Sequence, residues 1–137
     1  MMRSSLLALV ILIFAVSLHF IANFTGVYDM QIEAGFVWID NVIHFLIGIA
    51  FGFFGFGLVE KYKPESSLVF QVVFVFGFVL FSAVGWEIIE FAFLKLFTSY
   101  ALSLQIYSPS VIEAVTDICS NLAGALTVIG WMTVFKR

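Results

Sequence analysis

The sequence predicts an all-α integral membrane protein, a bundle of four membrane-spanning helices with both termini in the cytoplasm. The first observation is composition: 63% of the 137 residues are hydrophobic and 11% are charged, whereas a soluble domain is about a quarter charged. The second is four apolar runs, each long enough for a helix that crosses a membrane, which takes about 20 residues. The third is the distribution of basic residues along the chain.

Composition also excludes several classes of protein. Six Lys and Arg against nine Asp and Glu leave a net charge of -3. With a mean hydropathy of +1.14, the chain is too acidic and too apolar for a nucleic-acid binder. The single cysteine, Cys119, excludes an internal disulfide framework and a cysteine-based metal site. We expect one transmembrane domain over residues 1–137, surrounded by membrane lipids and without a nucleic-acid partner.

The four expected spans cover about residues 6–26, 36–59, 67–97 and 110–135. The first apolar run is longer than the core of about 15 residues in a signal peptide, so we interpret it as a retained helix. The charged segment 60–65 separates the second span from the third. Ser110 followed by Glu113 is typical of a capping box and begins the last span. Pro64 and Pro109 both lie outside the spans, where their missing N–H groups cost least.

The basic residues divide unevenly between the two faces that four alternating spans produce. Lys95 lies near the outer face, and the others lie near the inner face: Arg3, Lys61, Lys63, Lys136 and Arg137. Because cytoplasmic loops carry an excess of Lys and Arg, we predict a multi-pass protein of the cell membrane with both termini inside. The uncharged segment from Tyr100 to Tyr107 is then outside, either as a cover over a site or as an interfacial connector anchored by its tyrosines.

Each predicted span carries one pair of polar residues, three or four positions apart, a spacing that places both on one helical face. At about 1.5 Å per residue, all four pairs fall in the outer half of the membrane, although the helices alternate in direction. The pairs are His19 and Asn23, Asp40 and His44, Glu87 and Glu90, and Asp117 and Asn121. Because ionisable groups inside a membrane are costly, this alignment predicts a functional polar layer.

Small residues continue the face that begins with Asp40 and His44. Gly48, Gly52 and Gly55 follow on that face, and Gly124 and Ala125 occupy the last span. Membrane helices approach one another closely where their facing residues are small. We therefore expect these positions to serve helix packing.

Four of the paired residues are acids, and no Lys or Arg lies at their level. Like charges in a low-dielectric layer cannot all stay ionised without compensation, so acids keep protons, a histidine becomes a cation, or a divalent metal ion binds. Oxygen and imidazole ligands suit Zn, Mn or Fe(II), and Mg where the histidines do not ligate. The candidate metal ligands are Asp40, His44, Glu87, Glu90 and Asp117, with Asn121, His19 and Asn23 in support. No glycine-rich loop indicates a nucleotide cofactor.

Three segments resemble motifs of VanZ-like membrane proteins and the related YjdF-like proteins. Asp40 to Phe45 is similar to the D-x-x-x-H-F element of these families. Trp86 to Phe91 is similar to the W/Y-E-x-x-E-[WF] element, and Asp117 to Ala125 to the D-x-x-x-N-x-x-G-A signature. The chain has Asn41 where those families usually have a basic residue. The resemblance implies a small polytopic protein of the bacterial or archaeal membrane, in a group linked with glycopeptide-antibiotic tolerance and the cell envelope.

Three functions are compatible with these residues. In the first, a metal ion activates water, Glu87 or Glu90 acts as the catalytic general base, and the substrate is a lipid-linked or envelope molecule. In the second, the acids exchange protons in a proton- or cation-coupled transporter subunit, which with four helices requires an oligomer. In the third, the polar layer sets the helix register of a structural or assembly protein. Whether the protein is an enzyme stays open at this point.

Overall fold

The computed structural model describes residues 2–33, 38–107 and 110–135, and these residues form helices and short connections without any strand. The helices are α1 (Met2–Phe24), α2 (Val27–Glu33), α3 (Ile39–Tyr62), α4 (Leu68–Leu96), α5 (Thr98–Leu104) and α6 (Val111–Phe135). Four of them contain segments long and apolar enough to cross a membrane: Ser4–Phe24, Ile39–Tyr62, Leu68–Leu96 and Val111–Val134. The predicted all-α class and the four spans are confirmed, with boundaries shifted by a few residues.

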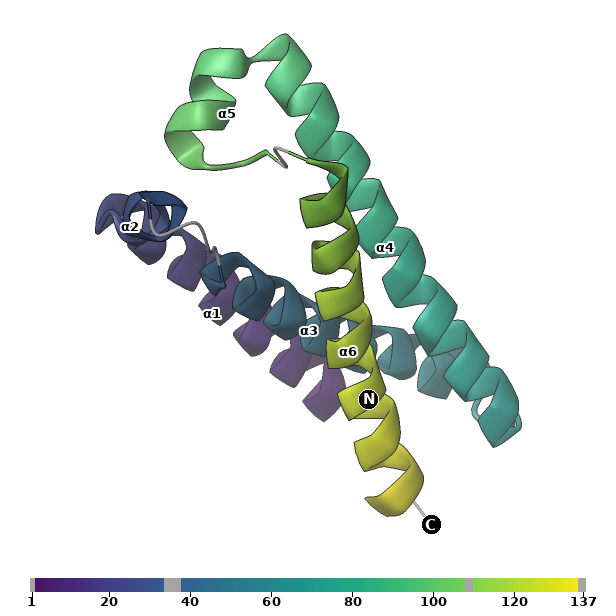
Figure 1. The fold of residues 1–137 in the computed structure, drawn as a ribbon. Helices are drawn as coiled ribbons and strands as arrows, with labels where there is room; N and C mark the ends of the chain where they lie inside the picture. The colour runs from purple at the N-terminus through teal and green to yellow at the C-terminus, as the bar shows by residue number, and fades with distance from the viewer. Residues whose placement is uncertain (1, 34–37, 108–109, 136–137) are drawn as a thin grey trace.

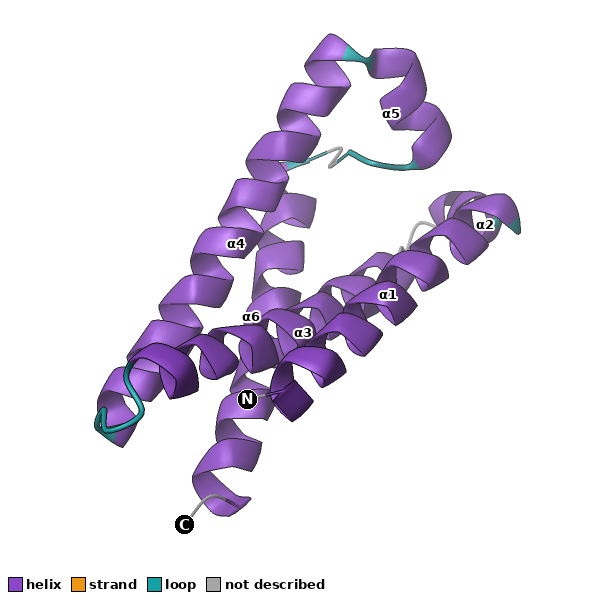
Figure 2. Ribbon diagram, turned by 180° about the vertical axis from the view of Figure 1, so that it is seen from behind, coloured by secondary structure: helices purple, strands orange, loops and turns teal. Residues whose placement is uncertain are grey.

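α3 lies at the centre of the bundle. It packs most extensively on α6 and on α1, and α4 contacts both α3 and α6 (Figure 1). Seen from behind, the α1–α3 arm and the α4–α6 arm diverge toward the end that carries α2 and α5 (Figure 2). The described ends of the chain lie at the opposite end of the bundle. The four long helices therefore alternate in direction, as the predicted spans require.

Glycines make the contact between α3 and α6 unusually close. A Cβ atom added at Gly48 would collide with the backbone of Asn121, and one added at Gly124 would collide with the backbone of Phe45. Further along α3, a Cβ at Gly52 would lie 3.1 Å from the side chain of Val128. The predicted packing role of these glycines is confirmed. The crossing also places the polar residues of α3 directly beside those of α6.

Side chains satisfy the first N–H groups of three helices. Ser67 accepts a hydrogen bond from the backbone N–H of Phe70 at the start of α4, and Ser110 accepts one from Glu113 at the start of α6. The bond at α6 confirms the serine half of the predicted capping box. At α3 the buried Gln31 accepts from the backbone N–H groups of both Trp38 and Ile39, a cap that comes from the preceding helix.

Large apolar side chains cover the outside of the long helices. Phe14, Phe81 and Val134, on three different spans, are 58%, 80% and 66% exposed. In water such continuous apolar surface would drive association, whereas hydrocarbon solvates it at no cost. The exposed surface therefore agrees with lipid as the solvent.

The short helices α2 and α5 lie in segments that we predicted only as connections. α5 begins the segment between α4 and α6, for which the sequence left open a cover or an interfacial connector. Three residues used in predicting the connections and the orientation lie outside the described residues: Pro109, Lys136 and Arg137.

Candidate functional site

The α3–α6 crossing brings together two acids and a histidine from separate spans. Asp40 and His44 lie one turn apart on α3, and Asp117 comes from α6. One potential ligand atom of each residue lies within 4.8 Å of the others, so this Asp40–His44–Asp117 group could hold a metal ion. His44 and Asp117 are 3% and 1% exposed. The group is therefore buried inside the bundle at the α2 and α5 end.

Asp117 is the most deeply buried member of the group. Among the described residues, its Oδ1 atom is buried and has no hydrogen-bond partner. The charges of four other acids act on it: Asp40, Glu87, Glu113 and Glu90. A buried polar atom without a partner costs about 1–3 kcal/mol, and more when it is charged. This carboxylate therefore requires a proton or a cation to compensate it.

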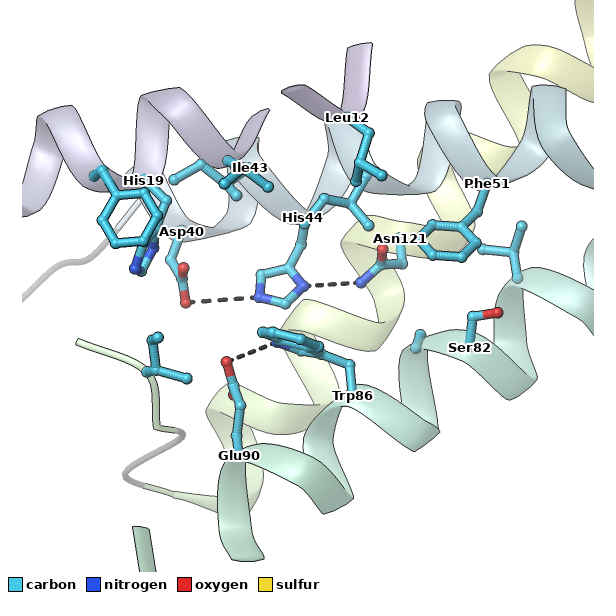
Figure 3. A pocket seen from close by; sticks show the side chains of 16 residues that line it. Leu12, His19, Asp40, Ile43, His44, Phe51, Ser82, Trp86, Glu90 and Asn121 are labelled. Atoms are coloured by element: carbon cyan, nitrogen blue, oxygen red, sulfur yellow. Dashed lines mark hydrogen bonds and ion pairs between the residues drawn. The ribbon is translucent and has the colours of Figure 1, made fainter. Parts of the chain in front are cut away.

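Asn121 determines the orientation of the His44 ring. Its Nδ2 atom lies 2.9 Å from Nδ1 of His44 and 3.0 Å from the carbonyl oxygen of Asp117, to which it donates. An amide nitrogen only donates, so in this arrangement Nδ1 accepts and the ring proton is on Nε2. Nε2 faces Oδ2 of Asp40 at 3.9 Å (Figure 3), which is too long for a hydrogen bond.

Tyr28 connects Asp40 to α1. Its hydroxyl donates to Oδ1 of Asp40 at 3.3 Å and lies 2.9 Å from Nδ1 of His19. Burial, followed by the charge of Asp40, raises the pKa of Tyr28 well above its usual value, so this hydroxyl keeps its proton. Because it carries one hydrogen, it can donate to only one of its two neighbours at a time. Tyr28 therefore bridges His19 on α1 and Asp40 on α3.

The pair His19 and Asn23 holds the segment that follows α4. Nε2 of His19 donates to the carbonyl oxygen of Leu104 at 3.0 Å, and Nδ2 of Asn23 donates to that of Ser103 at 3.2 Å. Both acceptors belong to the last turn of α5. The structure thus places these two supporting residues against the last turn of α5, outside the Asp40–His44–Asp117 group.

The two glutamates of α4 lie differently. Glu90 is 7% exposed, and its Oε1 accepts a hydrogen bond of 2.7 Å from Nε1 of Trp86. Glu90 also lines a cavity beside Asp40 and His44 (Figure 3). The carboxylate oxygens of Glu87 are buried, but among the described residues Glu87 belongs neither to that cavity wall nor to the group of three.

The cavity has a volume of about 370 Å³ and lies between α1, α3 and α4. Its polar wall consists of His19, Asp40, His44, Ser82, Glu90 and Asn121. The rest is largely apolar and includes Phe51 and Val79, and Ile106 contributes from the segment after α5. A volume of this size is within the range of small-molecule sites, about 300–1,000 Å³.

Sequence reasoning missed two residues of this region, Tyr28 and Gln31, and also the hydrogen bond that Trp86 donates. Tyr28 and Gln31 lie in the link between the first two spans, where polar and aromatic residues are typical of the membrane interface. No helical spacing connects them to Asp40. The one available signal was the position of Trp86 four residues before Glu90, which places both on one helical face.

The fold and the site define a class: a polytopic membrane protein with four candidate spans and a buried Asp/His/Asp group between two of them. The chain belongs to the DUF2238 family of predicted membrane proteins, whose family model matches residues 2–137. No curated protein and no solved structure matches the chain significantly.

Proposed function

We propose that the protein binds a divalent cation between Asp40, His44 and Asp117, in the outer half of the membrane, and acts through it on a lipid-phase or cell-envelope substrate. The observation that carries the proposal is the buried Oδ1 atom of Asp117, which lacks a hydrogen-bond partner among the described residues. This carboxylate lies in one group with an acid and an imidazole. A cation bound there would compensate its charge.

The geometry is compatible with one ion. Metal–ligand distances of about 2.0–2.6 Å allow a central ion to reach ligand atoms up to about 4–5 Å apart, and the three ligand atoms lie within 4.8 Å. Two carboxylates with one imidazole suit Zn, Mn or Fe(II), and Mg where His44 does not ligate. Ligation by Nε2 of His44 requires the ring proton on Nδ1, and the Asn121 amide would then turn its oxygen toward Nδ1.

The reaction that this site would support is metal-assisted attack of water. A cation held by Asp40, His44 and Asp117 would make water more acidic. Glu90 would accept the proton, because it lines the same cavity as Asp40 and His44. The hydrogen bond from Trp86 holds this carboxylate in one orientation. Glu87 remains the alternative base. Because it is not part of the described cavity wall, it would need a route for the proton from the cavity. The motifs similar to VanZ-like and YjdF-like proteins support a substrate of the cell envelope.

Metal analysis tests the proposal. The purified protein, stripped with a chelator and reloaded with Mn²⁺, should retain about one ion per chain. Asp117→Asn should lower the affinity for Mn²⁺ by at least about tenfold, because losing a ligand costs more than losing a group that orients one, which is worth 10–100-fold. Mn²⁺ bound is measured by electron paramagnetic resonance.

Asp29→Asn provides the matched control, since Asp29 is exposed on α2 and outside the group. It removes the same charge and should leave the affinity unchanged. Equal and negligible Mn²⁺ in the wild type and in Asp117→Asn would reject the proposal.

A further inference from the structure

The cavity beside the Asp40–His44–Asp117 group is much longer than a bound ion requires. Asp40, His44 and Glu90 lie at its polar end. Its wall reaches Phe51 on α3, seven residues beyond His44, and Val79 on α4, eleven residues from Glu90. At a rise of 1.5 Å per residue these separations correspond to about 10 and 16 Å. The cavity, whose wall also includes Ser82 and Asn121, is therefore elongated along the helices.

The cavity opens sideways between α1 and α4. α1 packs on α3 and touches α2, but among the described residues no comparable interface joins it to α4. Val16 on α1 and Trp86 on α4 line the cavity, yet they are 44% and 42% exposed. Both belong to candidate spans, so the surroundings of this opening are lipid chains, not water.

The segment around Ser103 to Ile106 covers the polar end of the cavity on the side that faces away from the lipid chains. Ile106 forms part of the cavity wall. The bonds from His19 to Leu104 and from Asn23 to Ser103 tie this segment to α1 directly above the site. A ligand that arrives from the lipid can therefore enter with less rearrangement than one that arrives from water.

We propose that the cavity binds one alkyl chain of a membrane amphiphile whose oxyanion head group, a phosphate or a carboxylate, reaches the cation of the Asp40–His44–Asp117 group. This inference rests on the proposed function and names the substrate class of the same site. The chain lies along the apolar wall toward Phe51 and Val79. An oxyanion fits the polar end only together with the cation, because three protein ligands leave coordination positions open and the acids alone repel it.

Photoaffinity labelling in phosphatidylcholine nanodiscs tests the inference. An extended chain advances about 1.2 Å per bond, so a dodecyl chain matches the distance of about 10–16 Å from the polar end to Phe51 and Val79. Three probes carry a diazirine at the chain end: dodecyl phosphate, dodecanoate and dodecylamine. With Mn²⁺ present, one or both oxyanion probes should label peptides around Phe51 and Val79 saturably, and unlabelled probe should compete. Comparing the two oxyanion probes distinguishes phosphate from carboxylate.

Matched variants test whether the probe is bound in the cavity when it labels the protein. Val16→Trp places a bulky side chain at the opening and should weaken the apparent affinity by about fivefold or more, as expected when space needed by a ligand is filled. Ile13→Trp is the control, because Ile13 is exposed on the same helix and does not line the cavity. Ser82→Leu on α4 repeats the test from the other side, with exposed Phe81→Leu as its control.

The outcomes separate this inference from the proposed function. Wild-type Mn²⁺ binding, together with labelling that neither saturates nor responds to Val16→Trp and Ser82→Leu, would overturn the chain site and leave the metal site intact. Saturable labelling by dodecylamine alone, without bound Mn²⁺, would reject both the metal and the oxyanion head group. Absence of both Mn²⁺ and saturable labelling would reject both proposals.

Discussion

Hydrogen bonds determine the orientation of individual polar side chains inside the bundle. Asn121 uses one amide nitrogen to hold both the His44 ring and the backbone of Asp117. Tyr28 supplies the one side-chain donor that the described residues show at Asp40. Neither residue carries a charge, yet each restricts an ionisable neighbour to one orientation. The His44 ring and the Asp40 carboxylate are therefore held by neutral groups.

The raised pKa of Tyr28 leads to a prediction at alkaline pH. In the unfolded chain the phenol ionises near pH 10, whereas burial keeps it protonated in the folded protein. Above about pH 10 the unfolded state thus binds fewer protons, and the free energy of unfolding falls as pH rises. We expect Tyr28→Phe to reduce this decline, measured as the unfolding midpoint in detergent between about pH 9 and 11.

Tyr100→Phe is the control for this measurement, because Tyr100 is 67% exposed on α5. It should leave the decline unchanged. An identical decline in the wild type and in Tyr28→Phe would show that burial of Tyr28 does not control its ionisation.

At the same scale, the sequence predicted the chemically active residues better than their neighbours. Asp40, His44, Asp117 and Asn121 lie together because helical spacing put each pair on one face and depth put both pairs at one level. Which acids meet was not predictable: Glu87 belongs to the predicted layer but not to the cavity wall. A rotation of one helix by a fraction of a turn decides that, and spacing within α4 does not specify its rotation against α3.

Among the helices, the α3–α6 crossing controls whether the site exists. Both glycines at the contact face backbone, not flexible side chains. An added methyl group at this contact would force the two helices apart and move Asn121 away from His44. Packing of small residues thus acts directly on the geometry of the metal ligands.

Gly48→Ala tests this dependence. The added methyl group would meet the backbone of Asn121, so we expect destabilisation of about 1–3 kcal/mol or more together with loss of Mn²⁺ binding. Stability is measured by the unfolding transition in detergent. Gly130→Ala on α6 is the control: nothing lies within 4 Å of its added Cβ, and Ala favours a helix by up to about 1 kcal/mol. Equal stability of the two variants would contradict the close crossing.

The short helices show where element prediction from sequence stops. α2 and α5 each contain seven residues, too few for a periodic apolar face and too few to be stable alone. Their backbones are ordered by partners distant in the sequence, such as His19 and Asn23 for the end of α5. No local sequence pattern predicts contacts between residues so far apart in the chain.

For the whole molecule, the prediction that remains is orientation in the membrane. The bundle places both described chain ends opposite α2 and α5, and the excess of Lys and Arg predicts that the chain ends are cytoplasmic. Green fluorescent protein fused after Arg137 should therefore fluoresce, and alkaline phosphatase fused after Gln105 should be active. Alkaline phosphatase fused after Lys63 should be inactive. The reverse pattern of activities would invert the bundle and place the metal site in the inner half of the membrane.

The sequence by itself determined the solvent, the number of long helices and the polar layer. Each of these follows from local quantities: apolar run length against the thickness of hydrocarbon, and residue spacing against the helical repeat. Only the tertiary structure decided which carboxylates converge on His44 and that the cavity opens between α1 and α4. It also decided that Tyr28 donates a hydrogen bond to Asp40 and that Gln31 caps α3. These features depend on the rotation and separation of helices far apart in the chain, which arise from close contacts such as Gly48 against Asn121.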